Sequence, residues 1–71
     1  MQFLGKTALV TGGTAGIGRS IALAFAKKGA SVSIFGTNEE RAKSVLQEME
    51  SLKSDPRQQF SYFIVYINLG Y

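Results

Sequence analysis

The sequence contains no cysteine and no histidine, and these two absences exclude several kinds of chemistry. Without cysteine the chain has no disulfide bond and no thiolate nucleophile. Without histidine it lacks the side chain that serves most often as a general base and as a metal ligand. No pair of carboxylates or metal-ligand cluster replaces them, so we expect no catalytic residue and no metal site in these 71 residues.

The sequence also lacks a long hydrophobic run. No stretch reaches the roughly 18 apolar residues that a membrane span needs, and residues 1–6 lack the charged and apolar regions of a secretory signal. We therefore expect a cytoplasmic chain without a membrane partner. The eight Lys and Arg residues exceed the five Asp and Glu residues, but they are scattered. This distribution favours a solvated surface over a nucleic-acid-binding stripe.

Five segments with regular hydrophobic patterns follow one another, and 71 residues suffice for one small domain. Strands are predicted at residues 6–11, 31–35 and 60–67, and helices at residues 17–28 and from the Thr37 cap to about residue 51. Right-handed crossovers between parallel strands then give the strand order 3-2-1, with both helices on the same face. The predicted fold is α/β, a partial Rossmann βαβαβ unit.

Each predicted helix has an apolar stripe that we expect to lie on the sheet. The stripes are Ile17, Ile21, Ala24 and Phe25 in the first helix, and Ala42, Val45, Leu46 and Met49 in the second. Gly29 is expected to end the first helix in the left-handed conformation. Thr37 is the expected N-cap of the second helix, in a capping box with Glu40.

A glycine-rich segment, Thr11 to Gly18, joins the first strand to the first helix. This arrangement favours phosphate binding, because the first N–H groups of a helix have no partner within it and the helix dipole makes that end partly positive. Glycines also let the backbone approach the anion closely. The candidate cofactor-binding residues here are Gly12, Gly13, Thr14, Ala15, Gly16, Ile17 and Gly18.

The spacing Gly12-x-x-x-Gly16-x-Gly18, preceded by Thr11, resembles the T-G-x-x-x-G-I-G motif of short-chain dehydrogenases/reductases. The likeness runs from about residue 5 to about residue 65. Within that family the sequence is most similar to 3-oxoacyl-(acyl carrier protein) reductases of fatty acid biosynthesis. The resemblance implies a dinucleotide cofactor whose pyrophosphate rests on the glycine-rich segment, with the Thr14 hydroxyl and the Ile17 backbone close to it.

The resemblance also places the adenosine ribose at the end of the second strand, near Gly36 and Thr37. A carboxylate there would bind the ribose of NAD and repel the 2′-phosphate of NADP, and the strand ends without one. The Thr37 hydroxyl and the Arg41 guanidinium could both meet a 2′-phosphate. We therefore expect NADP in preference to NAD. NAD remains the alternative, because Ala15 stands where many NADP-using relatives carry arginine.

The family's chemistry requires a serine and a Tyr-x-x-x-Lys pair, and none of Tyr62, Tyr66 and Tyr71 has a lysine four residues on. Relatives also commonly carry an aspartate that contacts the adenine where this chain has Tyr66. The expectation is a single truncated dinucleotide-binding half-domain, residues 1–71, that does not reduce a ketone on its own. The alternatives are a non-catalytic module that binds a nucleotide or a partner, and the remnant of a disrupted gene.

With both helices on one face, the other face of the sheet and the edge of the first strand are expected to be uncovered. That face would expose apolar side chains, and such a surface favours self-association. The expected side chains are Leu9, Val32, Ile34, Phe63 and Val65, or their alternating neighbours.

Overall fold

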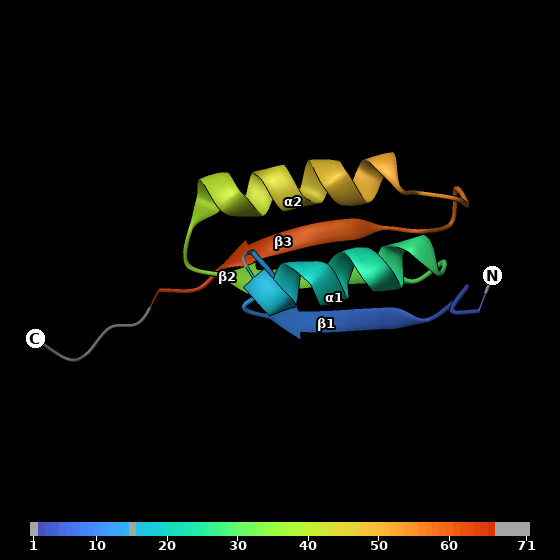
Figure 1. Cartoon of the computed structure of the whole chain (residues 1–71), viewed down its shortest axis with the longest axis horizontal. Coiled ribbons are helices and arrows are strands. Elements are labelled where there is room, and N and C mark those ends of the chain that lie inside the picture. The colour runs from blue at the N-terminus through green and yellow to red at the C-terminus, as the bar shows by residue number, and fades with distance from the viewer. Residues whose placement is uncertain (1, 15, 67–71) are drawn as a thin grey trace, which may run out of the picture.

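The computed structural model describes residues 2–14 and 16–66, which form a parallel three-stranded sheet with two helices packed on one face (Figure 1). The elements in chain order are β1 (Thr7–Thr11), α1 (Gly16–Lys27), β2 (Ser31–Gly36), α2 (Glu39–Ser51) and β3 (Phe60–Ile64). The strand order β1-β2-β3 and the parallel pairing confirm the predicted partial Rossmann unit. The last predicted residue of the third strand, Ile67, lies outside the described residues.

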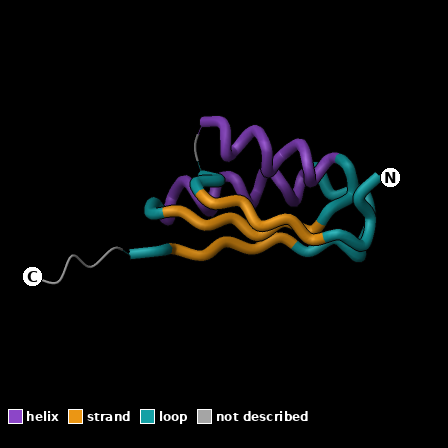
Figure 2. Tube along the Cα trace, turned by 90° about the horizontal axis from the view of Figure 1, so that it is seen from below, coloured by secondary structure: helices purple, strands orange, loops and turns teal. Residues whose placement is uncertain are grey.

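The core lies between the sheet and the two helices, which Figure 2 shows on the same side of the strands. Register sets its composition, because Val10 pairs with Ile34, and Val32 pairs with Ala8 and Phe60, so that these side chains share one face. The stripe predicted for α2 is confirmed: three of its residues are buried and Leu46 packs against them. The buried apolar residues are Val10, Ala22, Ala26, Ala30, Val32, Ile34, Ala42, Val45 and Met49.

The stripe predicted for α1 is wrong in its position on the helix. Ile17 and Ile21 are 80% and 43% exposed, and Ala24 is exposed as well, whereas Ala22 and Ala26 are completely buried. The completely buried residues of α1 are small, because the helix lies close to the sheet. Of the predicted stripe, Phe25 is partly buried and packs against the core, as does Leu23. Gly29 ends the helix with a positive φ of 96°, as the sequence predicts.

The uncovered face of the sheet carries the alternating set of side chains. Val32 and Ile34 lie beneath the helices with 0% exposure, so their prediction as exposed residues is wrong. The other predicted residues, Leu9, Phe63 and Val65, are exposed as expected, at 69%, 51% and 46%. Phe63 stacks on Phe35 with 5.1 Å between ring centroids. A strand exposes one of its two alternating sets of side chains, and the helix packing selects which one.

The N-cap of α2 is Asn38 rather than the predicted Thr37. The Oδ1 atom of Asn38 accepts the backbone N–H of Arg41 at 3.0 Å, and the extended backbone of Asn38 is typical of a cap. β2 continues as far as Gly36, so the helix begins one residue later than the capping box required. Thr37 is thereby free of the cap and faces the end of the sheet.

A charged pair joins the outer surfaces of the two helices. The Nε atom of Arg19 donates to Oε1 of Glu48 at 3.0 Å, and a second guanidinium N–H bonds to the other carboxylate oxygen. Because both side chains remain about 40% exposed, the pair contributes no more than about 1 kcal/mol. Neither α1 nor α2 is long and apolar enough to cross a membrane, and this statement covers the part of the chain that the structure describes.

A buried glutamine holds together the end of the domain opposite the glycine-rich segment. The Nε2 atom of Gln58 donates to the carbonyl oxygens of Ala26 and Ala30, both at 2.8 Å. Its Oε1 atom accepts the backbone N–H groups of Ser54 and Asp55 at 2.8 and 3.1 Å. Gln58 therefore ties the turn that precedes β3 to the connection between α1 and β2.

The turn itself contains a second polar contact. The Nε and backbone N–H groups of Arg57 both donate to Oδ1 of Asp55 at 2.9 Å. The side-chain hydrogen bond, followed by the backbone one, lowers the pKa of the Asp55 carboxyl to about 2. These contacts with Asp55 fix the turn that precedes β3.

We predict that Gln58→Ala lowers the free energy of unfolding by about 3 kcal/mol, because it removes a buried side chain and its four hydrogen bonds to backbone groups. Gln59→Ala is the matched control. The Gln59 side chain is exposed, so its removal should change stability by less than about 0.5 kcal/mol. Urea unfolding followed by far-ultraviolet circular dichroism measures both values. Equal stability of the two variants would contradict a structural role for Gln58.

Candidate functional site

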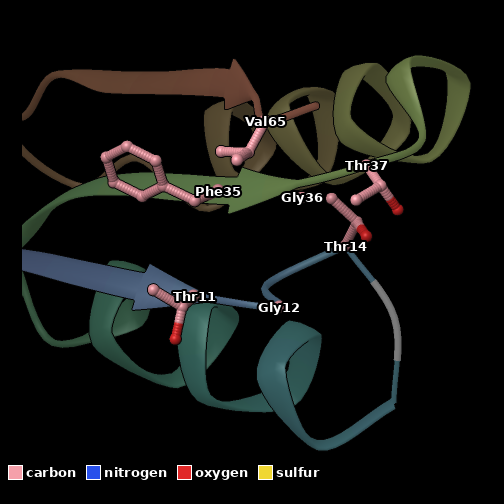
Figure 3. Close-up of a pocket in the computed structure, with 7 residues that line it drawn as sticks. All are labelled: Thr11, Gly12, Thr14, Phe35, Gly36, Thr37 and Val65. Carbon is pink, nitrogen blue, oxygen red and sulfur yellow. The ribbon is translucent and has the colours of Figure 1, made fainter. Parts of the chain in front are cut away.

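A cavity of about 310 Å³ opens at the carboxyl ends of the three strands (Figure 3). In open α/β sheets this is the end of the sheet at which ligands bind. The cavity receives residues from the glycine-rich segment, from the end of β2 and from the residue that follows β3. Its lining consists of Thr11, Gly12, Thr14, Phe35, Gly36, Thr37 and Val65.

Backbone hydrogen bonds beyond the strands set the shape of this cavity. The N–H of Gly12 donates to the carbonyl oxygen of Phe35, and the N–H of Val65 donates to that of Gly36, each at 2.8 Å. These bonds hold the three chain segments side by side after the regular strands have ended. Gly12 has a φ of 68°, which turns the chain away from the sheet and is favourable mainly for glycine.

The first turn of α1 lies directly over this turn of the chain. A Cβ atom on Gly18 would stand 2.1 Å from the carbonyl oxygen of Gly12 and 3.0 Å from the Cα atom of Gly13, so only glycine fits there. The close approach brings the N-terminus of α1 to the glycine-rich segment. The first turn of α1 contains no acidic residue that would compete with an anion for its free N–H groups.

Three of the predicted cofactor-binding residues line the cavity, namely Gly12, Thr14 and Thr37. Figure 3 shows the Thr14 and Thr37 side chains over the end of β2. Gly13 is buried beneath the segment, where an added Cβ would meet the side chain of Ile34 at 2.7 Å. Gly13 therefore packs against Ile34 of the sheet and is not among the residues that line the cavity.

The remaining predicted residues lie around the cavity. Gly16, Ile17 and Gly18 form the first turn of α1, and the side chain of Ile17 points into solvent. Ala15 lies outside the described residues. Arg41 is exposed in the first turn of α2 and is not among the residues that line the cavity, so its part in binding stays a prediction.

Sequence reasoning did not identify Phe35 and Val65 as lining residues. Both lie where their strands reach the carboxyl end of the sheet, and strand ends in parallel sheets meet at one edge. The position of Phe35 near the end of its strand therefore could have identified it from the sequence as a lining residue. Val65 follows β3 and reaches the cavity through its backbone bond to Gly36, a pairing that only the register reveals.

The cavity lining is free of charged side chains. Two carboxylates, Glu39 and Glu40, occupy the first turn of α2, and the Oε2 atom of Glu39 accepts the Tyr62 hydroxyl at 3.3 Å. Among the described residues there is no group of three or more His, Cys, Asp or Glu side chains placed to hold a metal ion. The site therefore offers backbone N–H groups, three threonine side chains and apolar walls, a set of groups suited to a phosphate-bearing ligand with an organic ring.

A family model described as short chain dehydrogenase matches residues 6–65, which include the whole glycine-rich segment and all three strands. The chain belongs to the short-chain dehydrogenase family. Members of this family use nicotinamide dinucleotide cofactors. The matched region includes every residue that lines the cavity and the first turn of α1.

Curated short-chain dehydrogenase relatives match the same region. The chain is 56% identical over 49 residues to a 3-oxoacyl-(acyl carrier protein) reductase of Aquifex aeolicus, a match that covers 69% of this chain and 20% of that protein. It is 51% identical over 49 residues to a 3β-hydroxysteroid dehydrogenase of Mediterraneibacter gnavus, covering 69% of this chain and 18% of that protein. Among eight curated relatives the chain spans 16 to 26% of the relative's length.

A solved short-chain dehydrogenase shares the fold. The crystal structure of the enzyme from Shigella flexneri superimposes with a TM-score of 0.79 at 32% identity, over 92% of this chain and 24% of that one. The βαβαβ unit described above thus corresponds to about a quarter of that chain.

We predict that Gly18→Ala lowers the free energy of unfolding by about 2 kcal/mol or more, because the new methyl group meets backbone atoms that have little room to move. Ser20→Ala, at an exposed position of the same helix, is the control and should change stability by less than about 0.5 kcal/mol. Thermal and urea unfolding measure both. A Gly18→Ala variant as stable as the parent chain would show that α1 does not rest on Gly12.

Proposed function

We propose that residues 1–71 form the cofactor-binding half of a dinucleotide-binding domain and that this half binds NADP in preference to NAD. The observation that carries the proposal is the uncharged cavity at the strand ends, bordered by the N-terminus of α1. A dinucleotide has an anionic pyrophosphate and an adenosine, and the two parts of the site match these two parts of the ligand.

The glycine-rich segment supplies the pyrophosphate contacts in this proposal. The N–H of Gly12 is already bonded to Phe35, so the donors are the N–H groups in the first turn of α1. The contact between Gly18 and Gly12 leaves no side chain between that turn and the strand ends. The Thr14 hydroxyl adds a donor inside the cavity.

The preference for NADP rests on the end of β2. Gly36 and Thr37 line the cavity there, and no carboxylate lies among the lining residues to bind the ribose of NAD. The Thr37 hydroxyl is available to a 2′-phosphate, because Asn38 caps α2 in its place. Arg41, exposed in the first turn of α2, is the candidate cation.

The parent activity we propose is reduction of a ketone, such as a 3-oxoacyl-carrier-protein, by hydride transfer. A bound nicotinamide cofactor would supply the hydride. The chain contains no Tyr-x-x-x-Lys pair, so the proton-transfer residues of the reaction must lie outside these 71 residues. Relatives matched over this region act on acyl and on steroid substrates at similar identity, so the region itself carries the cofactor site and leaves the substrate open.

We predict that the chain binds 2′,5′-ADP about tenfold more tightly than 5′-AMP, which corresponds to one added charge-assisted hydrogen bond. These two nucleotides represent the adenosine halves of NADP and NAD and need no nicotinamide site. Isothermal titration calorimetry measures both affinities, with the oligomeric state checked in the same sample.

Arg41→Ala should remove most of this preference. Lys43→Ala, which removes the same charge from another face of α2, should leave it intact. Equal binding of the two nucleotides would contradict the choice of NADP. A folded chain that binds neither nucleotide would contradict the cofactor-binding proposal as a whole.

A second candidate role is self-association through the uncovered face of the sheet. Leu9 and Phe63 are 69% and 51% exposed on that face, and within the described residues β1 pairs with β2 alone. The face carries no charged side chain along its strands, so nothing there opposes a second copy of the chain.

We predict that the chain sediments as a concentration-dependent oligomer and that Leu9→Lys shifts it to the monomer. Leu9 contributes little to the core, so the substitution should leave the fold intact. Ser44→Lys adds the same charge on the exposed side of α2 and should leave the oligomer unchanged. Sedimentation velocity distinguishes these outcomes, and a monomeric parent chain at every concentration would contradict this role.

A further inference from the structure

The end of β2 is shaped by a contact with the glycine-rich segment. A Cβ atom on Gly36 would stand 2.5 Å from Cγ2 and 3.0 Å from Oγ1 of Thr14. Figure 3 shows the two residues next to each other in the cavity. The side chain of Thr14 therefore occupies the space into which a side chain at position 36 would project.

The backbone at Gly36 does not itself require glycine. Its φ lies outside the left-handed region, unlike those of Gly12, Gly16 and Gly29. The residue is the last of β2, and its carbonyl oxygen accepts the N–H of Val65 as in a regular ladder. Space alone, rather than backbone conformation, thus excludes a larger residue here.

Position 36 also matters for cofactor choice. It lies at the carboxyl end of the second strand and lines the cavity, which is where a carboxylate would reach the ribose 2′-hydroxyl of NAD. We propose that Thr14 determines cofactor preference indirectly, because its side chain keeps an acidic residue out of position 36. Thr14 and Gly36 then determine cofactor preference together. Substituting either residue alone does not change the preference from NADP to NAD. This inference rests on the proposed function, since it concerns the same cavity.

A double-mutant cycle tests the contact without any ligand. Gly36→Ala should raise the unfolding equilibrium constant by about tenfold or more in the parent chain, and by about threefold or less in the Thr14→Ala background. Thr11→Ala is the matched control, since Thr11 lines the same cavity but is not among the atoms close to Gly36. In that background Gly36→Ala should cost as much as in the parent chain.

The double-mutant cycle also tests the contact if the Gly36→Ala variant does not fold. If Gly36→Ala abolishes folding, recovery of a cooperative urea transition in the Thr14→Ala/Gly36→Ala variant supports the proposal. A cost at position 36 that is the same in all three backgrounds overturns it.

The ligand experiment then tests specificity. Thr14→Ala/Gly36→Asp should bind 5′-AMP about tenfold more tightly than 2′,5′-ADP, whereas Gly36→Asp alone should bind 5′-AMP at least about tenfold less tightly than the double variant does. Equal 5′-AMP affinity of the single and double variants overturns the role of Thr14. If the parent chain binds neither nucleotide, the proposed function fails, and the double-mutant cycle still decides whether Thr14 restricts position 36.

Discussion

The close approach of α1 to the end of β1 is the constraint on which the rest of the structure depends. Gly18 rests on the carbonyl of Gly12 at a distance that admits no Cβ atom, and this contact fixes where the helix begins. The same approach selects Ala22 and Ala26 as the buried face of α1, since each follows Gly18 by whole turns of about four residues. The position of the α1 N-terminus beside the cavity and the small-residue face of α1 therefore both follow from one packing contact.

The opposite end of the domain is held by polar contacts instead. Gln58 is 1% exposed, yet its amide is bonded to backbone groups of α1, of the connection between α1 and β2 and of the turn that precedes β3. A buried amide with every partner in place specifies one arrangement of these segments, because any shift leaves a polar group unpaired. The sheet is thus fixed at one end by glycines and at the other by a glutamine, and the cavity lies at the end where backbone N–H groups remain free.

The two faces of the sheet differ in what covers them. One face packs beneath the helices and holds the core, while the other presents Leu9 and the stacked pair of Phe35 and Phe63. Phe35 belongs to both the uncovered face and the cavity, so a partner on that face and a ligand in the cavity would share a wall. In a short-chain dehydrogenase of known structure the matched region is about a quarter of the chain.

The sequence by itself determined the order of elements, the parallel sheet, the buried stripe of α2 and the glycine-rich segment, because these depend on periodicity and on residues with unusual backbone preferences. It did not determine which set of strand side chains is buried, which face of α1 meets the sheet, or which of Thr37 and Asn38 caps α2. Those outcomes depend on how elements far apart in the chain pack together. The contacts of Gln58 with Ala26 and of Thr14 with Gly36 likewise arise only after folding, since they join residues that have no local relation to one another.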